Sequence, residues 1–334
     1  MKTTRLRGAI LTGVVGSALM LAACSGGDSP GGEGDDTHEI AVVLKTLSSP
    51  YWLQVAGGVE AAAEETGADV TLAGATKETE VQEQVNKVRS AITQQVDALV
   101  VAPTEAEQLQ PILDQAVDQD IPVLLVDTDI EDWDGKETFI GTDNYSAGQT
   151  GGEFIMEAED GGEIGFIRGV PGNPSVDARI DGAQDVLEDS DFEFVADLPA
   201  DSDRAEARSV MADMLQSNPD LSAVFAGNDD MALGAIEAIK GADMDVDDVF
   251  VVGVDGTQDA VDSILADELN ATIAQNSYDM GKTSVETAVA LLDGEDIDER
   301  IDTGVTVVTS DNAEEYGDEL EEHEADEGVA DEDG

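Results

Sequence analysis

The sequence predicts an α/β protein built from two lobes, each with a parallel sheet. Short, fully apolar segments alternate with amphipathic segments along most of the 334 residues. Fully apolar strands are typical of parallel sheets that helices cover on both faces. The alternation forms two series of similar length, one before and one after about Gly141. A chain of this length has room for two such lobes.

In the first series, an amphipathic segment follows each of the first three strands. One of these segments carries Val81, Val85, Val88 and Ile92 at the spacing of a helix that buries one face. The expected strands are Ile40–Leu44, Val70–Ala73, Ala98–Ala102 and Val123–Val126. The expected helices are Tyr51–Thr66, a helix around Val81–Ile92, and Glu105–Asp118.

The second series follows Phe139–Gly141 and has the same character. Its expected strands are Ile164–Ile167, Phe192–Ala196, Ala223–Ala226, Val249–Val254, Ala271–Gln275 and a short last strand, Val305–Val308. Its expected helices are Ser146–Ala158, Val176–Leu187, Ala205–Leu215, a helix from Met231, Gln258–Leu265 and Gly281–Leu292. Residues 311–334 are strongly acidic and predict a disordered tail.

Acidic residues dominate the charge of the chain. There are 76 Asp and Glu residues against 15 Lys and Arg residues, for a formal net charge of −61, and most of the acids lie within the two series. Such a surface repels nucleic acid, which binds through Lys and Arg. It also repels itself unless salt screens it, so we expect a protein of a halophilic or salt-tolerant organism. A moderately acidic secreted protein is the alternative.

The sequence offers few residues for catalysis or metal binding. Its two histidines, His38 and His323, lie in the junction before the first strand and in the acidic tail, and Cys24 is its single cysteine. A nucleophilic triad or a His-based metal site therefore has almost no material. No glycine-rich dinucleotide or Walker-type phosphate motif follows a strand. We expect neither an enzyme nor a cofactor.

The first 24 residues have the pattern of a secretion signal peptide. Three basic residues precede an apolar run, Ala9–Leu21, which is short for a membrane span. The run leads into Leu-Ala-Ala-Cys, which resembles a bacterial lipobox and implies acylation of Cys24. An ordinary cleaved signal with a chance cysteine is the alternative. Residues 25–38 then predict an acidic, Gly-rich tether, so we expect an extracytoplasmic protein lipid-anchored to the cell membrane.

Polar side chains gather where the predicted strands end, and this edge of an open α/β sheet binds ligands. The clearest example is the strand Ala223–Ala226, which Gly-Asn-Asp-Asp and a helix follow. Carboxylates, amides, an Arg and aromatic rings suit a neutral polyhydroxy compound, because they hydrogen-bond hydroxyl pairs and cover C–H groups. The candidate ligand-binding residues are Ser49, Tyr51, Trp52, Asp127, Arg179, Asn228, Asp255 and Gln275.

Each of these residues has a simpler explanation when it is taken alone. Tyr51 and Trp52 could equally be core residues at the start of a helix. Asp127 and Asp255 could be loop caps, and Arg179 could be an ordinary surface residue. Asp229 and Asp230 suit helix capping, which we expect for at least one of them. The shared position at strand ends favours the binding interpretation.

At these residues the chain resembles the ribose-binding-protein type of periplasmic binding protein, which binds sugars for ABC importers. The resemblance covers about Ile40 to Val308. Its strongest segments are Leu47–Trp52, Ala178–Gly182, Phe225–Gly234, Val252–Thr257 and Ala271–Gln275. The resemblance implies that all of the candidate residues named above contact the sugar.

Four positions depart from the ribose-binding pattern. Ala102 replaces an amide after the third strand, Thr128 replaces an Arg, and Ser202 and Val254 replace aromatic residues. These flanks are smaller and less polar, so ribose itself is a poor expectation. A larger pentose or hexose, or a polyol such as an inositol, fits the room gained.

The resemblance also implies a topology of two Rossmann-like lobes joined by a three-segment hinge. The chain then crosses between lobes near Thr142, near Gln275 and near Thr303. The expected N-terminal lobe comprises residues 39–142 plus 276–304. The expected C-terminal lobe comprises residues 143–275 plus 305–310.

The implied function is that of a solute-binding protein, acting as a monomer. It captures a sugar between its lobes and delivers it to an ABC permease with a cytoplasmic ATPase. A sugar-sensing subunit that feeds a membrane chemoreceptor or histidine kinase is the alternative. A sugar-responsive repressor shares the fold, but the lipobox and the acidic charge argue against a DNA-binding protein.

Overall fold

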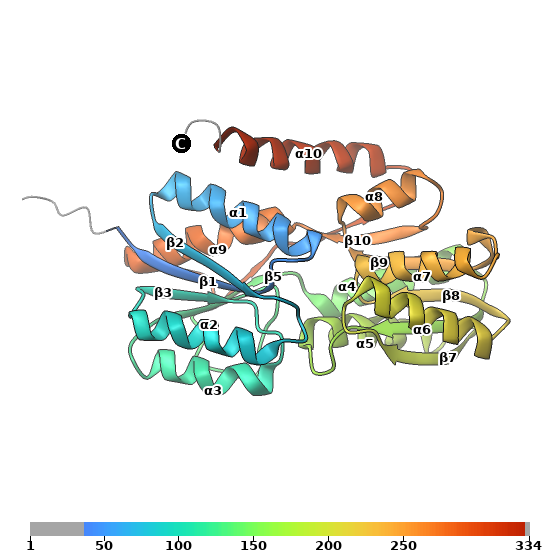
Figure 1. Ribbon diagram of the computed structural model, residues 1–334, viewed down its shortest axis with the longest axis horizontal. Helices are drawn as coiled ribbons and strands as arrows, with labels where there is room; N and C mark the ends of the chain where they lie inside the picture. The colour runs from blue at the N-terminus through green and yellow to red at the C-terminus, as the bar shows by residue number, and fades with distance from the viewer. Residues whose placement is uncertain (1–36, 331–334) are drawn as a thin grey trace, which may run out of the picture. The chain divides into compact units, whose positions relative to one another are not determined.

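The computed structural model describes residues 37–330, with the side chains of residues 37–323. This part of the chain contains two six-stranded sheets with helices packed on both faces (Figure 1). The predicted signal peptide, Cys24 and nearly all of the predicted tether lie outside the described residues. Within residues 37–330, no helix combines the length and the apolar character that a membrane crossing needs.

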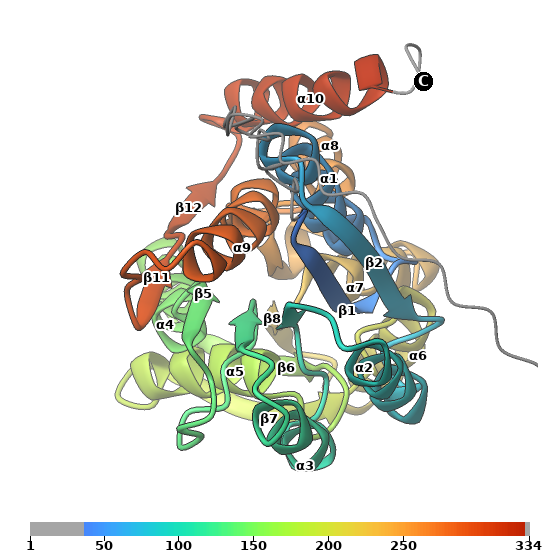
Figure 2. The ribbon, with the colours of Figure 1, turned by 90° about the vertical axis from the view of Figure 1, so that its left-hand side faces the viewer.

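The first sheet has the strand order β11-β5-β4-β3-β1-β2, and all neighbouring strands are parallel. Its strands are β1 Glu39–Thr46, β2 Asp69–Ala75, β3 Ala98–Val101, β4 Val123–Val126, β5 Thr138–Gly141 and β11 Arg300–Asp302. Helices α1 Pro50–Thr66 and α9 Ser277–Leu292 cover one face, and α2 Val81–Gln94 and α3 Ala106–Val117 cover the other (Figure 2). We call this part the N-terminal lobe.

The second sheet has the strand order β12-β10-β9-β8-β6-β7. Its strands are β6 Gly162–Arg168, β7 Phe192–Pro199, β8 Leu221–Ala226, β9 Phe250–Asp255, β10 Ala271–Gln275 and β12 Val305–Val308. Helices α4 Asn144–Ala158 and α5 Pro174–Leu187 cover one face. Helices α6 Arg204–Ser217, α7 Asp229–Gly241 and α8 Gln258–Leu265 cover the other, with a 3₁₀ turn η1 at Val246–Asp248. We call this part the C-terminal lobe.

The predicted α/β class with two mainly parallel sheets is confirmed. The short strand β12 is the exception, since it runs antiparallel to β10. Strand β11 escaped prediction because Ile301 is its only apolar residue and gives no pattern. The lobe boundaries named from the sequence stay a proposal.

The prediction of a disordered tail from residue 311 is wrong for Ala313–Ala330, which form helix α10. Ala313, Tyr316 and Leu320 are buried and join the core of the C-terminal lobe. Their spacing of three and four residues places them on one side of the helix. The many acidic residues between them concealed this sparse apolar face.

Helix α10 also reaches the N-terminal lobe. It packs on α8 near its start and contacts α1 (Figure 1). Farther along the helix, the ring of His323 stacks on Tyr278 of α9, with ring centroids 4.3 Å apart. The helix therefore contacts both lobes.

Two glycines allow α4 and α5 to pack with their backbones nearly in contact. A Cβ atom on Gly148 would lie 1.9 Å from the carbonyl oxygen of Arg179, and one on Gly182 would lie 2.2 Å from that of Tyr145. This packing brings Asn144, at the start of α4, to the Arg179 side chain, whose Nε donates to Asn144 Oδ1 at 2.7 Å. Helix packing therefore fixes the direction in which the Arg179 guanidinium points.

Candidate functional site

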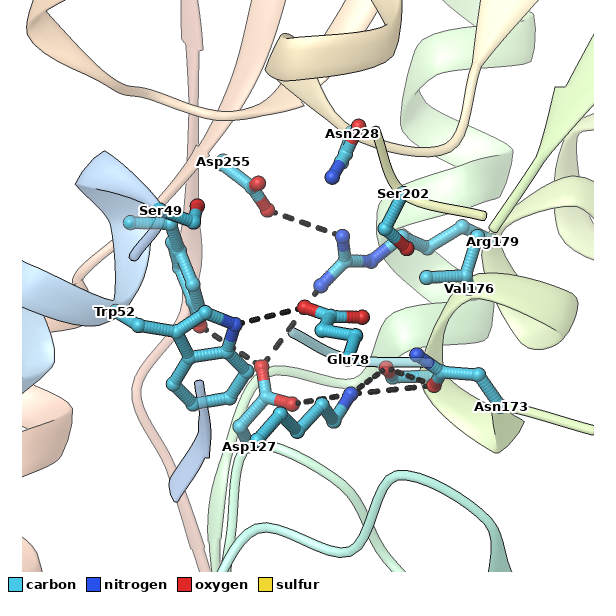
Figure 3. A pocket seen from close by; sticks show the side chains of 13 residues that line it. Ser49, Trp52, Glu78, Asp127, Asn173, Val176, Arg179, Ser202, Asn228 and Asp255 are labelled. Carbon is cyan, nitrogen blue, oxygen red and sulfur yellow. Dashed lines mark hydrogen bonds and ion pairs between the residues drawn. The ribbon is translucent and has the colours of Figure 1, made fainter. Parts of the chain in front are cut away.

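A small cavity, which we call the inner cavity, lies between the two lobes beyond the carboxyl ends of their strands (Figure 3). Its volume is about 20 Å³, room for roughly one water molecule. The N-terminal lobe contributes Lys45, Ser49, Tyr51, Trp52, Glu78 and Asp127. The C-terminal lobe contributes Asn173, Ser175, Val176, Arg179, Ser202, Asn228 and Asp255.

Every candidate residue named from the sequence lines this cavity except Gln275. Gln275 is buried behind Asp255, to whose Oδ1 its Nε2 donates at 2.8 Å. The Oε1 atom of Gln275 has no hydrogen-bond partner among the described residues. In this structure Gln275 therefore orients a carboxylate that lines the cavity.

Arg179 links carboxylates from the two lobes. Its Nη1 donates to Asp255 Oδ1 at 3.0 Å and to the Gly227 carbonyl at 2.9 Å. Its Nη2 lies 4.0 Å from Asp127 Oδ2, and all three charged side chains are buried. Buried charges are costly unless they are paired, so this arrangement offsets much of the cost of desolvating the two carboxylates.

Lys45, at the end of β1, is a buried cation that sequence analysis did not select. Its Nζ lies 3.1 Å from Asp127 Oδ1, and it donates across the cleft to Asn173 Oδ1 at 3.1 Å and to Ser175 Oγ at 2.9 Å. The sequence held one signal for it, because Thr128 replaces the Arg that ribose binders carry beside the strand-end Asp. Lys45 supplies a cation at Asp127 from another strand.

The pKa values of the two carboxyls that flank Arg179, Asp127 and Asp255, are shifted in opposite directions. Burial opposes ionisation of Asp127, but the charges of Lys45 and Arg179 outweigh it and lower the pKa of this carboxyl. Burial raises the pKa of Asp255 well above its usual value, although Arg179 acts against the rise. Asp127 is therefore a firm hydrogen-bond acceptor, whereas Asp255 retains a proton more readily.

Both carboxylates also have uncommon backbone conformations. The φ angle is 62° at Asp127 and 136° at Asp255, where side chains other than Gly are rarely found. Such conformations cost free energy and occur preferentially at functional sites. The φ of Asp127 recurs at turns elsewhere in the described chain, whereas that of Asp255 does not recur at any other non-glycine residue there, so the strain is concentrated at Asp255.

Tyr51 and Trp52 combine the core role and the site role that the sequence left open. Both are buried in the core of the N-terminal lobe, and their rings meet edge to face at 5.0 Å. Their polar atoms reach the cavity residues, since Tyr51 Oη donates to Asp127 Oδ2 at 2.8 Å and Trp52 Nε1 donates to Glu78 Oε1 at 2.9 Å. Both residues therefore belong to the core and to the cavity wall at the same time.

The polar corner after β8 differs from the sequence prediction in one respect. Asn228 caps α7, because its Oδ1 accepts from the Met231 N–H at 2.9 Å, and it also lines the cavity. The expectation that Asp229 or Asp230 caps the helix is wrong. Asp230 instead lies 3.2 Å from Arg204, and the Ser49 hydroxyl donates to it from the other lobe at 3.4 Å.

Asp229 is buried and holds the loop at Gly256 and Thr257 through hydrogen bonds. Its Oδ2 accepts from the N–H groups of Gly256 and Thr257 at 2.9 and 2.8 Å, and from the Thr257 hydroxyl at 3.1 Å. Its Oδ1 accepts from the Thr272 hydroxyl at 2.7 Å. These contacts hold the chain directly after Asp255. Asp229 therefore positions the site without lining the cavity.

Replacing Asp229 by Asn is expected to remove one pH-dependent part of stability. Burial raises the pKa of Asp229 to about 6 despite its hydrogen bonds, so the folded chain holds this proton more tightly than the unfolded chain. This contribution to stability is fully present below about pH 4 and is lost as pH rises through about 6. In urea melts, the difference in free energy of unfolding between Asp229→Asn and the native chain should shift by roughly 2–3 kcal/mol in favour of the variant as pH rises from 4 to 7.

Asp213→Asn, at an exposed position of α6, is the matched control and should follow the native pH profile. Asn retains the acceptor for Gly256 and Thr257, and its amide faces the Thr272 hydroxyl, which can also accept. An Asp229→Asn profile parallel to that of the native chain would show that this carboxyl does not titrate in the range.

The periplasmic binding protein domain model matches residues 40–296. The chain belongs to the periplasmic binding protein family. This periplasmic binding protein is 32% identical over 300 residues to the ribose import binding protein of Bacillus subtilis. The match covers 88% of this chain and 96% of the relative. It is 34% identical over 260 residues to the D-allose-binding periplasmic protein of Escherichia coli, covering 75% and 83% of the two chains.

Among solved structures, an ABC transporter solute binding protein from Agrobacterium vitis with bound D-fucose superposes with a TM-score of 0.79 and is 33% identical. The match covers 82% of this periplasmic binding protein and 96% of that chain. These relatives confirm the resemblance to the ribose-binding type. They are binding proteins, which confirms that the chain is a solute-binding protein and not an enzyme.

Within the described residues of this periplasmic binding protein, no group of three or more His, Cys, Asp or Glu side chains is arranged to hold a metal ion. Asp127 and Asp255 in the inner cavity instead pair with Lys45 and Arg179, and Glu78 accepts from the Trp52 indole. The arrangement offers hydrogen-bond donors and acceptors rather than metal ligands.

Proposed function

We propose that this periplasmic binding protein captures a sugar between its two lobes and delivers it to the membrane permease of an ABC importer. The observation that carries the proposal is the row of alternating charges, Lys45, Asp127, Arg179 and Asp255, which spans both lobes. A ligand that bridges this row contacts both lobes at once and so favours the closed form.

The charge balance of the row supports a neutral ligand. Two buried cations face two buried carboxylates in the row, and Glu78 adds a further carboxylate to the cavity wall, so the centre carries no excess positive charge that would attract an anion. The same groups accept and donate at several angles, which suits the neighbouring hydroxyls of a sugar. The faces of Tyr51 and Trp52 suit its C–H groups.

The walls of the cavity support a ligand other than ribose. Ser202 lines the cavity where ribose binders carry an aromatic residue, and the departures at Val254 and Ala102 are buried apolar residues. We infer that the ligand is a pentose, a hexose or a polyol that uses the space at Ser202. The proposed sugar contacts are those of Ser49, Tyr51, Trp52, Asp127, Arg179, Asn228 and Asp255, with Gln275 supporting Asp255.

We also propose an extracytoplasmic, membrane-anchored location. The signal-like first 24 residues and the Leu-Ala-Ala-Cys motif support lipidation of Cys24, and the periplasmic relatives support the compartment. An anchored monomer presents its cleft to a permease in the same membrane. Release of the protein into the medium by Cys24→Ser would support the anchor, whereas unchanged membrane retention would contradict it.

A ligand screen tests the proposed function. The purified mature chain is heated with pentoses, hexoses and polyols, and each hit is measured by titration calorimetry. We expect a neutral sugar with a Kd near 1 μM, about −8 kcal/mol. At a hundredfold excess over Kd it should stabilise the fold by about 2.7 kcal/mol. Stabilisation by amino acids or anionic metabolites, with no response to any sugar or polyol, would contradict the proposal.

A further inference from the structure

A second cavity adjoins the inner cavity, and we call it the outer cavity. It also lies between the lobes and has a volume of about 360 Å³. Its lining residues are Thr46, Ser48, Ser49, Lys77, Glu78, Thr79, Asp201, Ser202, Asp203, Arg204, Glu206 and Asp230. Three of them, Ser49, Glu78 and Ser202, line the inner cavity as well, so the two spaces meet at these side chains.

Two buried polar atoms at this junction have no partner among the described residues. They are the second carboxylate oxygen of Glu78, Oε2, and the hydroxyl oxygen of Ser202. The other oxygen of Glu78 is held by the Trp52 indole, which fixes the carboxylate at the junction (Figure 3). Buried polar atoms are nearly always hydrogen-bonded, so an unpaired carboxylate oxygen and an unpaired hydroxyl at one place call for a partner from outside the chain.

Three side chains, those of Ser49, Glu78 and Ser202, stand between the two cavities, and two of them are short. Ser202 stands where ribose binders carry an aromatic ring, and a bulky ring there would fill the space between the two cavities. The inner cavity has little volume of its own, whereas the outer cavity falls within the size range of small-molecule pockets. The cleft therefore has more room in the outer cavity, beyond Ser202, than at the charged row.

The chemistry of the outer cavity favours hydroxyl groups over anions. Glu78, Asp201, Asp203, Glu206 and Asp230 contribute carboxylates to its lining. The two cations of the lining do not balance them, and one of these cations, an arginine, is already paired with Asp230. Carboxylates accept hydrogen bonds from hydroxyls and repel phosphates and other carboxylates.

We propose that the pentose, hexose or polyol unit inferred above carries a second unit, so that the full ligand is a neutral extended sugar, a disaccharide or a glycosylated polyol. The proposal rests on the proposed function. One ring lies against the charged row once the lobes have parted and closed around it, because the inner cavity of this structure has room for roughly one water molecule. The second unit passes between Glu78 and Ser202 into the outer cavity, where its hydroxyls donate to Glu78 Oε2 and hydrogen-bond to the Ser202 hydroxyl.

Calorimetry with matched pairs of probes tests the proposal on the full mature chain. The pairs are glucose with maltose and cellobiose, galactose with melibiose, and myo-inositol with galactinol. We expect an extended member of one pair to bind at least tenfold more tightly than its single-ring partner. Equal affinities, or binding of single rings alone, would overturn the proposal while leaving the proposed function intact. Failure of every sugar to bind would overturn both.

Two variants place the same bulky residue inside and outside the outer cavity. Thr79→Trp fills the outer cavity at an exposed position that does not line the inner cavity. It should weaken binding of the extended probe at least tenfold and change binding of the single ring less than twofold. Thr93→Trp, on the exposed side of α2, should change neither. Equal effects of Thr79→Trp on both probes would also overturn the proposal.

Discussion

Replacing Arg179 by Ala is expected to abolish measurable sugar binding and to lower the free energy of unfolding by about 3–5 kcal/mol. The guanidinium is buried between Asp127 and Asp255 and also donates to Asn144 and to the Gly227 carbonyl. Its loss leaves two buried carboxylates without their shared cation. It also removes the group that connects the lobes through the proposed ligand.

The measurements are urea melts for stability and calorimetry for affinity, with Arg168→Ala as the matched control. Arg168 pairs with Asp177, Asp181 and Asp197 but is partly exposed and does not line the cavity. Exposed ion pairs contribute at most about 1 kcal/mol each, so this variant should bind normally. Arg179→Lys keeps the charge without the planar fork and should fall between the two. Normal affinity in Arg179→Ala would remove this residue from the site.

Raising the salt concentration from 0.1 M to 2 M KCl is expected to raise the melting temperature by about 10 °C or more, equivalent to about 3–5 kcal/mol for a chain of this size. The formal charge of −61 produces strong self-repulsion in the compact state. The Debye length falls from about 10 Å at 0.1 M to about 3 Å at 1 M, so molar salt screens most surface pairs. Most of the gain should therefore occur below about 1 M.

A scanning melt with KCl steps measures the effect, and trimethylamine N-oxide is the control. This osmolyte strengthens burial by exclusion from the surface and carries no net charge to screen acids. A steep response to low salt with a gradual response to the osmolyte supports screening. A melting temperature that is flat in KCl would contradict adaptation to high salt and favour an ordinary acidic secreted protein.

The two parallel sheets could be predicted because their strands are buried on both faces. Strands such as β3 and β4 are entirely apolar, and helices α2 and α3, which precede them, show a clear apolar face. Helix α10 and strand β11 could not be predicted in the same way. Each depends on contacts with distant parts of the chain, and each has few apolar residues among many charges.

The candidate site was largely predictable because its residues follow strand ends, where parallel sheets place their ligands. Lys45 and Glu78 were missed for a physical reason. A lysine at the end of β1 and a glutamate in a loop after β2 look exposed in sequence, and only the meeting of the two lobes buries their charged ends. Asn173 and Ser175 were missed because their cavity contact is with Lys45 of the opposite lobe.

Helix α10 has a consequence for the population of binding-competent molecules. Its apolar residues Tyr316 and Leu320 belong to the core of the C-terminal lobe, yet it touches α1 and stacks His323 on Tyr278 of the other lobe. A hinge motion that draws α1 away from α8 must exchange these contacts for water. Each 1.4 kcal/mol they supply multiplies the closed-to-open ratio tenfold. The contacts of the C-terminal helix with α1 and α9 therefore favour the arrangement of the lobes seen in this structure, from residues that do not line the inner cavity.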